Sequence, residues 1–132
     1  MPRPSWLTPL WERVEISLGG FVTLTNIGTA YDTINAARGL GLVNVDLTNV
    51  VAIDFGVNVN KIGNGTQSWQ LWNETDGIQL GVIDDAGGTG NKTLTVTISS
   101  DIPAGTKTLR VRAKSTTAAD DPLYFGSFLV LR

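Results

Sequence analysis

A chain of 132 residues is long enough for one domain that buries roughly two-thirds of its unfolded surface. Its composition, 42% hydrophobic and 17% charged, is typical of a globular protein rather than a disordered one. The net charge of −2 argues against nucleic-acid binding, because a surface that contacts phosphates usually leaves a domain basic. Cysteine and histidine are absent, which excludes disulfides and thiol chemistry and removes the commonest general base and zinc ligand.

Residues 1–11 predict an extended arm, followed by a single β-sandwich domain over residues 12–132. Prolines at positions 2, 4 and 9 remove backbone donors and restrict φ, so we expect no helix in the arm. Trp6, Leu7 and Trp11 carry a large apolar area that calls for a partner surface. Two alternatives stay open: the arm covers the core of its own domain, or it contacts a neighbouring subunit or another protein.

The same arm lacks the charged and apolar regions of a signal peptide, so we expect no export. No apolar run in the chain approaches the ~18 residues that a membrane helix needs, so we expect no membrane contact either.

Residues 12–25 alternate between apolar and polar side chains, which is typical of a half-buried strand. Gly19 and Gly20 interrupt the alternation, so we expect a bulge or a hairpin at that point.

Residues 26–41 are ambiguous. Tyr31 to Arg38 fits one or two helical turns, but also a short strand or a loop. The apolar side chains of residues 40–45 then predict a short strand.

Three strands come next. Residues 51–60 alternate strictly, residues 66–73 carry two of the four tryptophans, and residues 78–82 alternate again. Glycine-containing turns at residues 63–65 and 76–77 separate them, because glycine and asparagine tolerate positive φ. We expect a β-meander whose apolar face needs a second layer.

The remaining strands complete an all-β pattern. Residues 84–91 predict a polar turn, residues 93–98 a strand of β-branched side chains, and residues 123–131 a final strand that is apolar on both faces. About eight strands at short spacing and no long helix predict a two-sheet antiparallel sandwich, with a jelly roll as the preferred topology.

The strand over residues 109–114 points Leu109, Val111 and Ala113 inward and Arg110, Arg112 and Lys114 outward. Such a cationic stripe is usually a solvated face, and the alternative is contact with a negatively charged partner surface.

Aspartates in two loops resemble calcium ligands. Asp84 and Asp85 precede a glycine-rich turn, and Asp120 and Asp121 lie in another loop. Their spacing does not match an EF-hand, and turn formation explains them equally well. The chain also shows no phosphate-binding loop and no distinctive carboxylate pair. We therefore predict no catalytic residue, no bound cofactor and no metal, and the chain is not expected to be an enzyme.

Trp69 and Trp72, among Gln67, Gln70 and Asn73, have the composition of a sugar-binding platform. Positions 69 and 72 differ by an odd number, however, so in a regular strand the two rings face opposite sides of the sheet. One is expected in the core and the other on the surface. A carbohydrate-binding module with surface aromatics remains the alternative function, and an enzyme that uses only carboxylates a more remote one.

Residues 50–128 resemble small β-sandwich structural proteins of tailed-phage virions. The resemblance lies in two phrases, QSWQLWNETDGIQLGVIDDAGGTGNKTL and TLRVRAKSTTAADDPLYFGSF. It implies a virion protein, made in the host cytoplasm, that decorates a capsid or forms part of a head or tail appendage. It also implies a homo-oligomer, a trimer in particular, and a partner such as the major capsid protein. No functional residue follows from the resemblance. The apolar arm and the cationic stripe supply the candidate partner-binding residues: Trp6, Leu7, Trp11, Arg110, Arg112 and Lys114.

Overall fold

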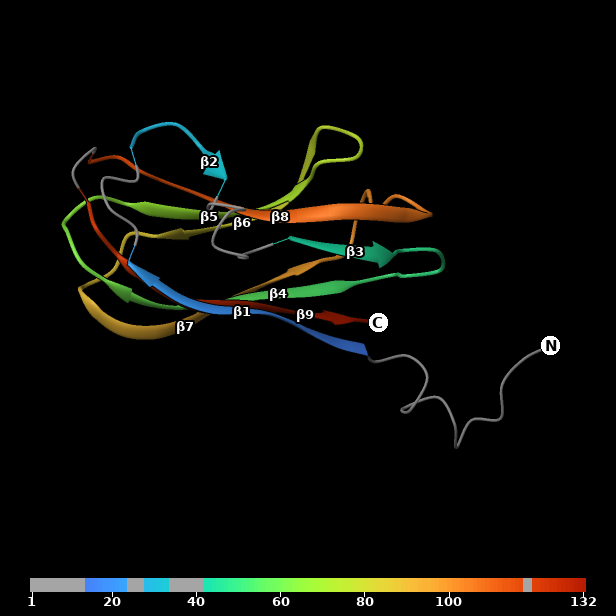
Figure 1. The fold of residues 1–132 in the computed structure, drawn as a ribbon, viewed down its shortest axis with the longest axis horizontal. Coiled ribbons are helices and arrows are strands. Elements are labelled where there is room, and N and C mark those ends of the chain that lie inside the picture. Colours follow the sequence, from blue (N-terminus) through green and yellow to red (C-terminus); the bar gives the residue numbers. More distant parts are fainter. Residues whose placement is uncertain (1–13, 24–27, 34–41, 118–119) are drawn as a thin grey trace.

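The structure is a computed structural model that describes residues 14–23, 28–33, 42–117 and 120–132. Its described part forms two antiparallel sheets packed face to face (Figure 1). The nine strands are β1 (Val14–Thr23), β2 (Asp32–Thr33), β3 (Leu42–Asp46), β4 (Ile53–Lys61), β5 (Gln67–Asn73), β6 (Ile78–Asp85), β7 (Gly90–Ile98), β8 (Thr106–Ser115) and β9 (Leu123–Leu131).

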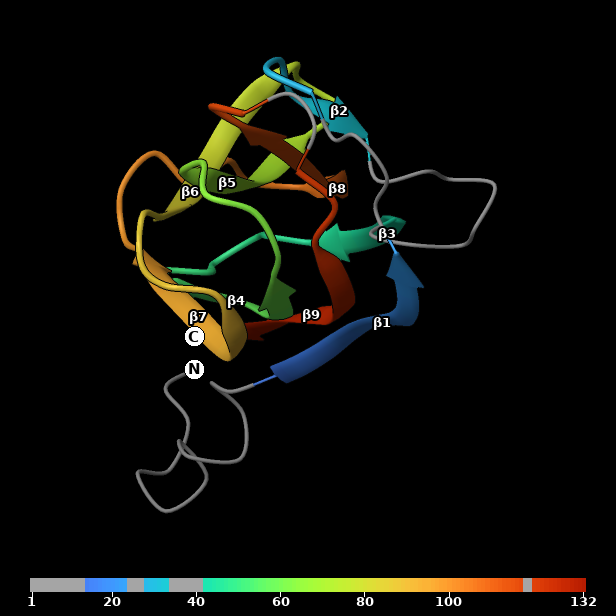
Figure 2. The same cartoon turned by 90° about the vertical axis from the view of Figure 1, so that its left-hand side faces the viewer.

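Sheet A has the strand order β1-β9-β4-β7, and sheet B has the order β2-β8-β5-β6, with β3 also paired to β8. β2 and β3 both pair with the same edge of β8, at different parts of its length, so together they take the place of one strand. Counted in this way, each sheet is four strands wide. In Figure 2, β6 lies above β7 at one side of the sandwich, and β3 above β1 at the other. This is the jelly-roll arrangement, so the predicted fold class is confirmed.

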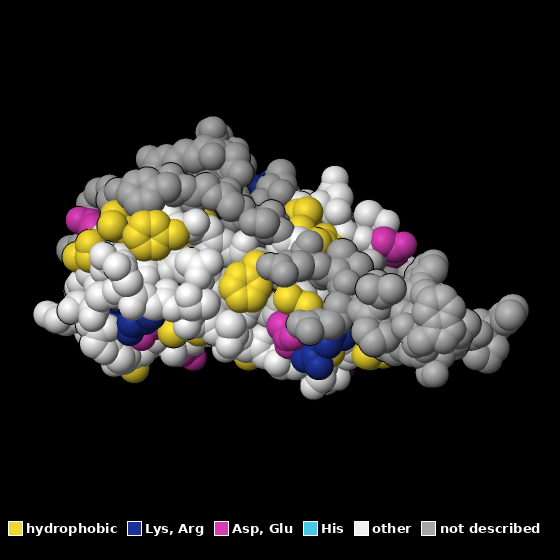
Figure 3. Space-filling model, turned by 90° about the horizontal axis from the view of Figure 1, so that it is seen from below, with side chains coloured by type: hydrophobic (Ala, Val, Ile, Leu, Met, Phe, Trp, Pro, Cys, Tyr) yellow, Lys and Arg dark blue, Asp and Glu magenta, His cyan; other side chains and the backbone are white. Residues whose placement is uncertain are grey.

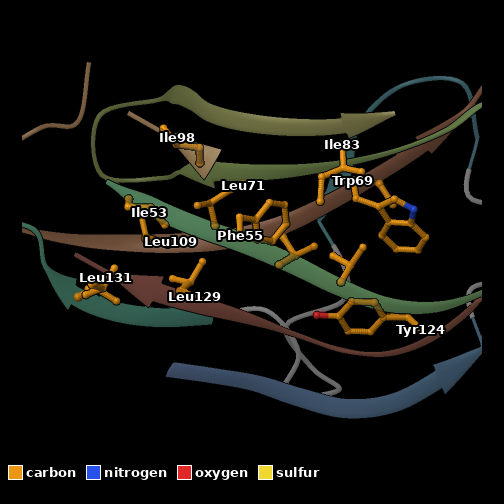
Figure 4. Close-up of a cluster of buried hydrophobic side chains, with 14 of the residues drawn as sticks. Ile53, Phe55, Trp69, Leu71, Ile83, Ile98, Leu109, Tyr124, Leu129 and Leu131 are labelled. Carbon is orange, nitrogen blue, oxygen red and sulfur yellow. The ribbon is translucent and has the colours of Figure 1, made fainter. Parts of the chain in front are cut away.

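The core lies between the sheets, where each strand buries one alternating set of side chains. Phe55 and Leu129 from sheet A and Leu71 from sheet B are fully buried (Figure 4). Trp69 of β5 stacks on Tyr124 of β9 across the two sheets, with ring centroids 5.8 Å apart. Burying a large apolar side chain stabilises the folded state by about 1.5–3 kcal/mol, so this layer dominates the stability.

Several local predictions are confirmed by the strand register. The final strand runs from Leu123 to Leu131. In β8, Leu109, Val111 and Ala113 are buried while the three cations between them are partly exposed. The pairing of β1 with β9 shifts between Gly19 and Val22, which is the irregularity that the two glycines predict.

The predicted meander of three consecutive strands is wrong. β4 pairs with β7 and β9 in sheet A, whereas β5 pairs with β6 and β8 in sheet B. The turn between β4 and β5 therefore crosses from one sheet to the other, helped by Gly63, whose φ is +108°. Alternation shows that a strand has one buried face. It does not show whether the next strand lies beside it in the same sheet or opposite it in the other sheet, because both arrangements bury that face.

The ambiguous segment contains the two-residue strand β2, and its other predicted features fall on residues outside the described ranges. The arm of residues 1–11, with Trp6, Leu7 and Trp11, also lies outside them. Among the described residues, no helix has the length and apolarity that crossing a membrane requires.

Candidate functional site

The outer face of sheet A displays an apolar strip on β9, formed by Phe128 and Val130. Both side chains are partly exposed, on the face opposite the buried Leu129 and Leu131. The distal end of the Phe128 ring lies against Gly56 of β4, so close that a β-carbon added at residue 56 would lie 2.7 Å from Phe128 Cε2 and nearer still to Cζ. The absence of a side chain at Gly56 thus leaves the space that the Phe128 ring fills.

Polar side chains of β4 and β7 lie on one side of this strip, and Figure 3 shows charged side chains, in blue and magenta, on the same face. Thr93, Thr95 and Thr97 of the edge strand β7 are exposed on the same face, next to β4. Thr93 Oγ1 donates a hydrogen bond to Asn58 Oδ1 at 2.7 Å. The charged Asp54 on this face is paired with Arg132 at 2.7 Å. In the register of the sheet, Val130 lies between Asp54 of β4 and Glu15 of β1, so acidic residues border the strip at this end.

The outer face of sheet B carries the predicted cationic stripe, and it is more than a solvated face. Arg110 pairs with Glu74 at the β5–β6 turn. The guanidinium of Arg112 lies 4.5 Å from the Trp72 ring centroid and 5.7 Å from that of Tyr31. Lys114 Nζ lies 4.4 Å from the same Tyr31 ring. The structure thus brings together three of the predicted residues and adds two aromatic rings.

Tyr31 was not predicted as part of any site. It precedes β2, which pairs with β8 so that Asp32 lies opposite Ala113, and this register sets Tyr31 beside Lys114. Burial and the nearby Asp84 carboxylate raise the pKa of its phenol, although a hydrogen bond with Ser68 and the nearby Arg112 act in the opposite direction. The residue stands 81 positions before Arg112, and no local pattern in the sequence connects the two.

A layer of amides lies beneath these rings. Gln70 of β5, 4% exposed, is directly opposite Arg112, and its Nε2 donates to Gln79 Oε1 of β6 at 2.8 Å. Three buried polar atoms of this face have no hydrogen-bond partner: Gln70 Oε1, Arg110 Nη1 and Arg112 Nε. Leaving such groups unpaired costs about 1–3 kcal/mol each, so an external partner would be stabilising.

The two tryptophans of β5 divide as their spacing predicts. Trp69 is fully buried in the core, and Trp72 is partly exposed on the outer face under Arg112. The sugar platform formed by both rings is therefore not present.

The aspartate loops close one end of the sandwich. Asp120 is buried and accepts hydrogen bonds from Ser115 Oγ at 2.7 Å, Gln67 Nε2 at 3.3 Å and the Gly65 amide at 3.2 Å. Burial by itself raises the pKa of this carboxyl, but the three hydrogen bonds together outweigh it and hold the pKa below its usual value.

Two lysines hold the glycine-rich turn between β6 and β7. The buried Lys61 Nζ donates to the carbonyls of Asp85 and Gly87 at 2.9 and 2.6 Å. Lys92 pairs with the Asp85 carboxylate at 3.0 Å. The aspartates thus meet protein donors, and the described residues contain no group of three His, Cys, Asp or Glu side chains suited to a metal ion. Sequence reasoning named the aspartates but missed Lys61, Gln67 and Gly65 as their partners, because these residues lie 24 to 55 positions away.

Comparison with known proteins gives the fold and no family. No protein-family model matches the chain, and no curated protein matches it. Among solved structures, the xylan-binding module CBM15 is similar over 90% of this chain and 95% of that one, with a TM-score of 0.53 and 15% identity. The VP2 subviral particle of infectious bursal disease virus is similar over 90% of this chain but 32% of that one, with a TM-score of 0.51 and 12% identity. Carbohydrate-binding modules and viral capsid proteins thus share this jelly roll, and at such identities the likeness concerns the fold alone.

Proposed function

We propose that the chain is a non-enzymatic structural protein of a virion, a capsid decoration protein that self-associates, as a trimer, and binds the major capsid protein. The observation that carries the proposal is the outer face of sheet A, where Phe128 and Val130 of the interior strand β9 are partly exposed. Exposed apolar side chains in the interior of a sheet face are a common feature of a protein contact.

The composition of this face is compatible with a second copy of the chain as its occupant. In a cyclic trimer the contacts are head-to-tail, so this face meets a different surface of the neighbouring copy. Thr93, Thr95 and Thr97 carry no charge and offer hydroxyls for hydrogen bonds to that surface. Covering Phe128 adds about 1.5–3 kcal/mol of hydrophobic stabilisation for full burial, and less for a ring that is already partly covered.

The arrangement of the rings disfavours a module for neutral sugars. A stacking platform needs open, coplanar aromatic faces, whereas Trp69 is buried and Trp72 and Tyr31 are each covered by a cation. The absence of histidine and cysteine, and the engagement of Asp85 and Asp120 with protein donors, support a protein without catalysis.

Co-sedimentation with purified tailed-phage capsids that lack decoration tests the proposal. The wild-type chain is expected to pellet with the capsids, and Phe128→Asp to remain in the supernatant, because a carboxylate buried at the contact between copies disrupts the trimer that binds the capsid. Ile78→Asp is the matched control: Ile78 is 42% exposed in sheet B, so the same change there leaves binding intact. Equal pelleting of both variants would refute the role of sheet A, and no pelleting of the wild type would refute the decoration role.

A further inference from the structure

The outer face of sheet B holds two cations, Arg112 and Lys114, that form no ion pair within the described residues. The other lysines and arginines of that part of the chain pair with a carboxylate or, for Lys61, with two carbonyls: Lys61 at Asp85 and Gly87, Lys92 at Asp85, Lys107 at Asp76, Arg110 at Glu74 and Arg132 at Asp54. Arg112 donates one hydrogen bond from Nη2 to the Tyr31 carbonyl at 3.2 Å. Arg112 and Lys114 lie side by side over the Tyr31 ring.

We propose that this face binds an acidic saccharide, a sugar ring that carries a carboxylate, with Arg112 and Lys114 on the carboxylate and Gln70 on ring hydroxyls. A guanidinium beside an ammonium is a favourable site for a carboxylate, because charge-assisted hydrogen bonds are about twice as strong as neutral ones. The site goes beyond the proposed structural function, since it lies on the sheet opposite the apolar strip.

The buried polar atoms of this face that lack a hydrogen-bond partner favour a sugar over a simple anion as the ligand. Arg110 Nη1 and Arg112 Nε are donors, and Gln70 Oε1 is an acceptor. Gln70 is opposite Arg112, and the next pair on the same face is Trp72 with Arg110. The three unpartnered atoms therefore belong to two cross-strand pairs that lie roughly 7 Å apart along the strands. A carboxylate accepts hydrogen bonds but cannot donate one to Gln70. A sugar hydroxyl does both, so an acidic sugar suits the whole set once movement of Arg112 has uncovered these buried atoms.

The aromatic rings fit the same ligand. In the unbound protein the guanidinium of Arg112 occupies the face of Trp72 at 4.5 Å. When a carboxylate draws the guanidinium away, Trp72 offers its face to the apolar side of a sugar ring. A neutral sugar cannot compensate the lost cation–π contact by an ion pair, so the covered ring itself favours acidic sugars.

Isothermal titration calorimetry with three probes tests the proposal: trigalacturonate, its methyl ester and polyglutamate. The methyl ester keeps the ring and loses the charge, while polyglutamate keeps the charge and has no hydroxyls. We expect trigalacturonate to bind, and the other two to bind at least tenfold more weakly. Binding should weaken at high salt, as a partly exposed ion pair requires.

Variants locate the site. Arg112→Gln and Lys114→Gln are expected to weaken trigalacturonate binding at least tenfold, whereas Arg132→Gln removes the same charge from the other sheet and leaves affinity unchanged. Lys114 is partly exposed and makes no hydrogen bond within the described residues, so its variant should fold normally, and melting curves check this. The proposal would be overturned if trigalacturonate did not bind at millimolar concentration, or if the methyl ester or polyglutamate bound as tightly. Retained binding in both variants would overturn it as well.

Discussion

Replacing Gly56 by alanine tests whether the Phe128 ring rests on β4. Gly56 has no positive φ, so alanine fits its backbone, and removing glycine from a strand interior stabilises the folded state by about 0.5–1 kcal/mol. Against this, the new methyl group would lie 2.7 Å from Phe128 Cε2 and nearer to Cζ, where carbon atoms prefer 3.5–4.0 Å. Overpacking of this kind costs about 1–3 kcal/mol, so the steric effect outweighs the backbone effect.

The sign of the effect should therefore depend on the ring. In the wild type, Gly56→Ala is expected to destabilise the protein; in a Phe128→Ala background it should stabilise it by about 0.5–1 kcal/mol. The backbone effect is common to both backgrounds and cancels, so the difference is a coupling energy of about 1–3 kcal/mol between the two positions. Calorimetric melting of the four proteins measures it, since 1 kcal/mol shifts the melting temperature of a domain this size by roughly 4 °C.

Equal effects of Gly56→Ala in both backgrounds would refute the reasoning. The ring would then not rest on Gly56, and the apolar strip would not have the shape described above.

Three other predictions concern the loops and the arm. The pKa of Asp120 is lowered in the folded state, so its contribution to stability is present above the unfolded pKa of about 3.9 and is lost as the pH falls through the folded pKa. Melting curves from pH 6 to pH 2 should therefore show a smaller loss of stability at acid pH in Asp120→Asn than in the wild type. An identical loss in both proteins would contradict this. Chelators should leave the melting temperature unchanged, whereas a calcium site at a hundredfold excess over Kd would add about 2.7 kcal/mol. If the arm contacts a partner, Trp6→Ala should reduce partner binding at least tenfold, as expected for loss of a large aromatic anchor; if the arm instead covers its own core, the same variant should keep binding and lower the melting temperature by several degrees.

Much of the fold follows from residue types and spacing. The alternation of Leu109, Val111 and Ala113 with three cations fixes both faces of β8, and the odd spacing of Trp69 and Trp72 correctly separates a core ring from a surface ring. These inferences succeed because the side-chain period of a strand is local and strict.

Features that depend on tertiary proximity were out of reach. The sequence does not say that β5 leaves the sheet of β4, because both strands bury one face in either arrangement. Tyr31 meets Lys114, and Asp120 meets Gln67, only after the sheets have assembled. The cationic stripe was predicted, yet the rings that give it a chemical character come from β5 and from the segment before β2.

Light scattering of the purified chain at micromolar concentration tests the central claim most directly, since a structural protein that self-associates through sheet A should be an oligomer in solution. The wild type is expected to have a mass in solution of three times 14.1 kDa, and Phe128→Asp a mass of 14.1 kDa. A wild-type chain that stays at 14.1 kDa across this range would contradict it.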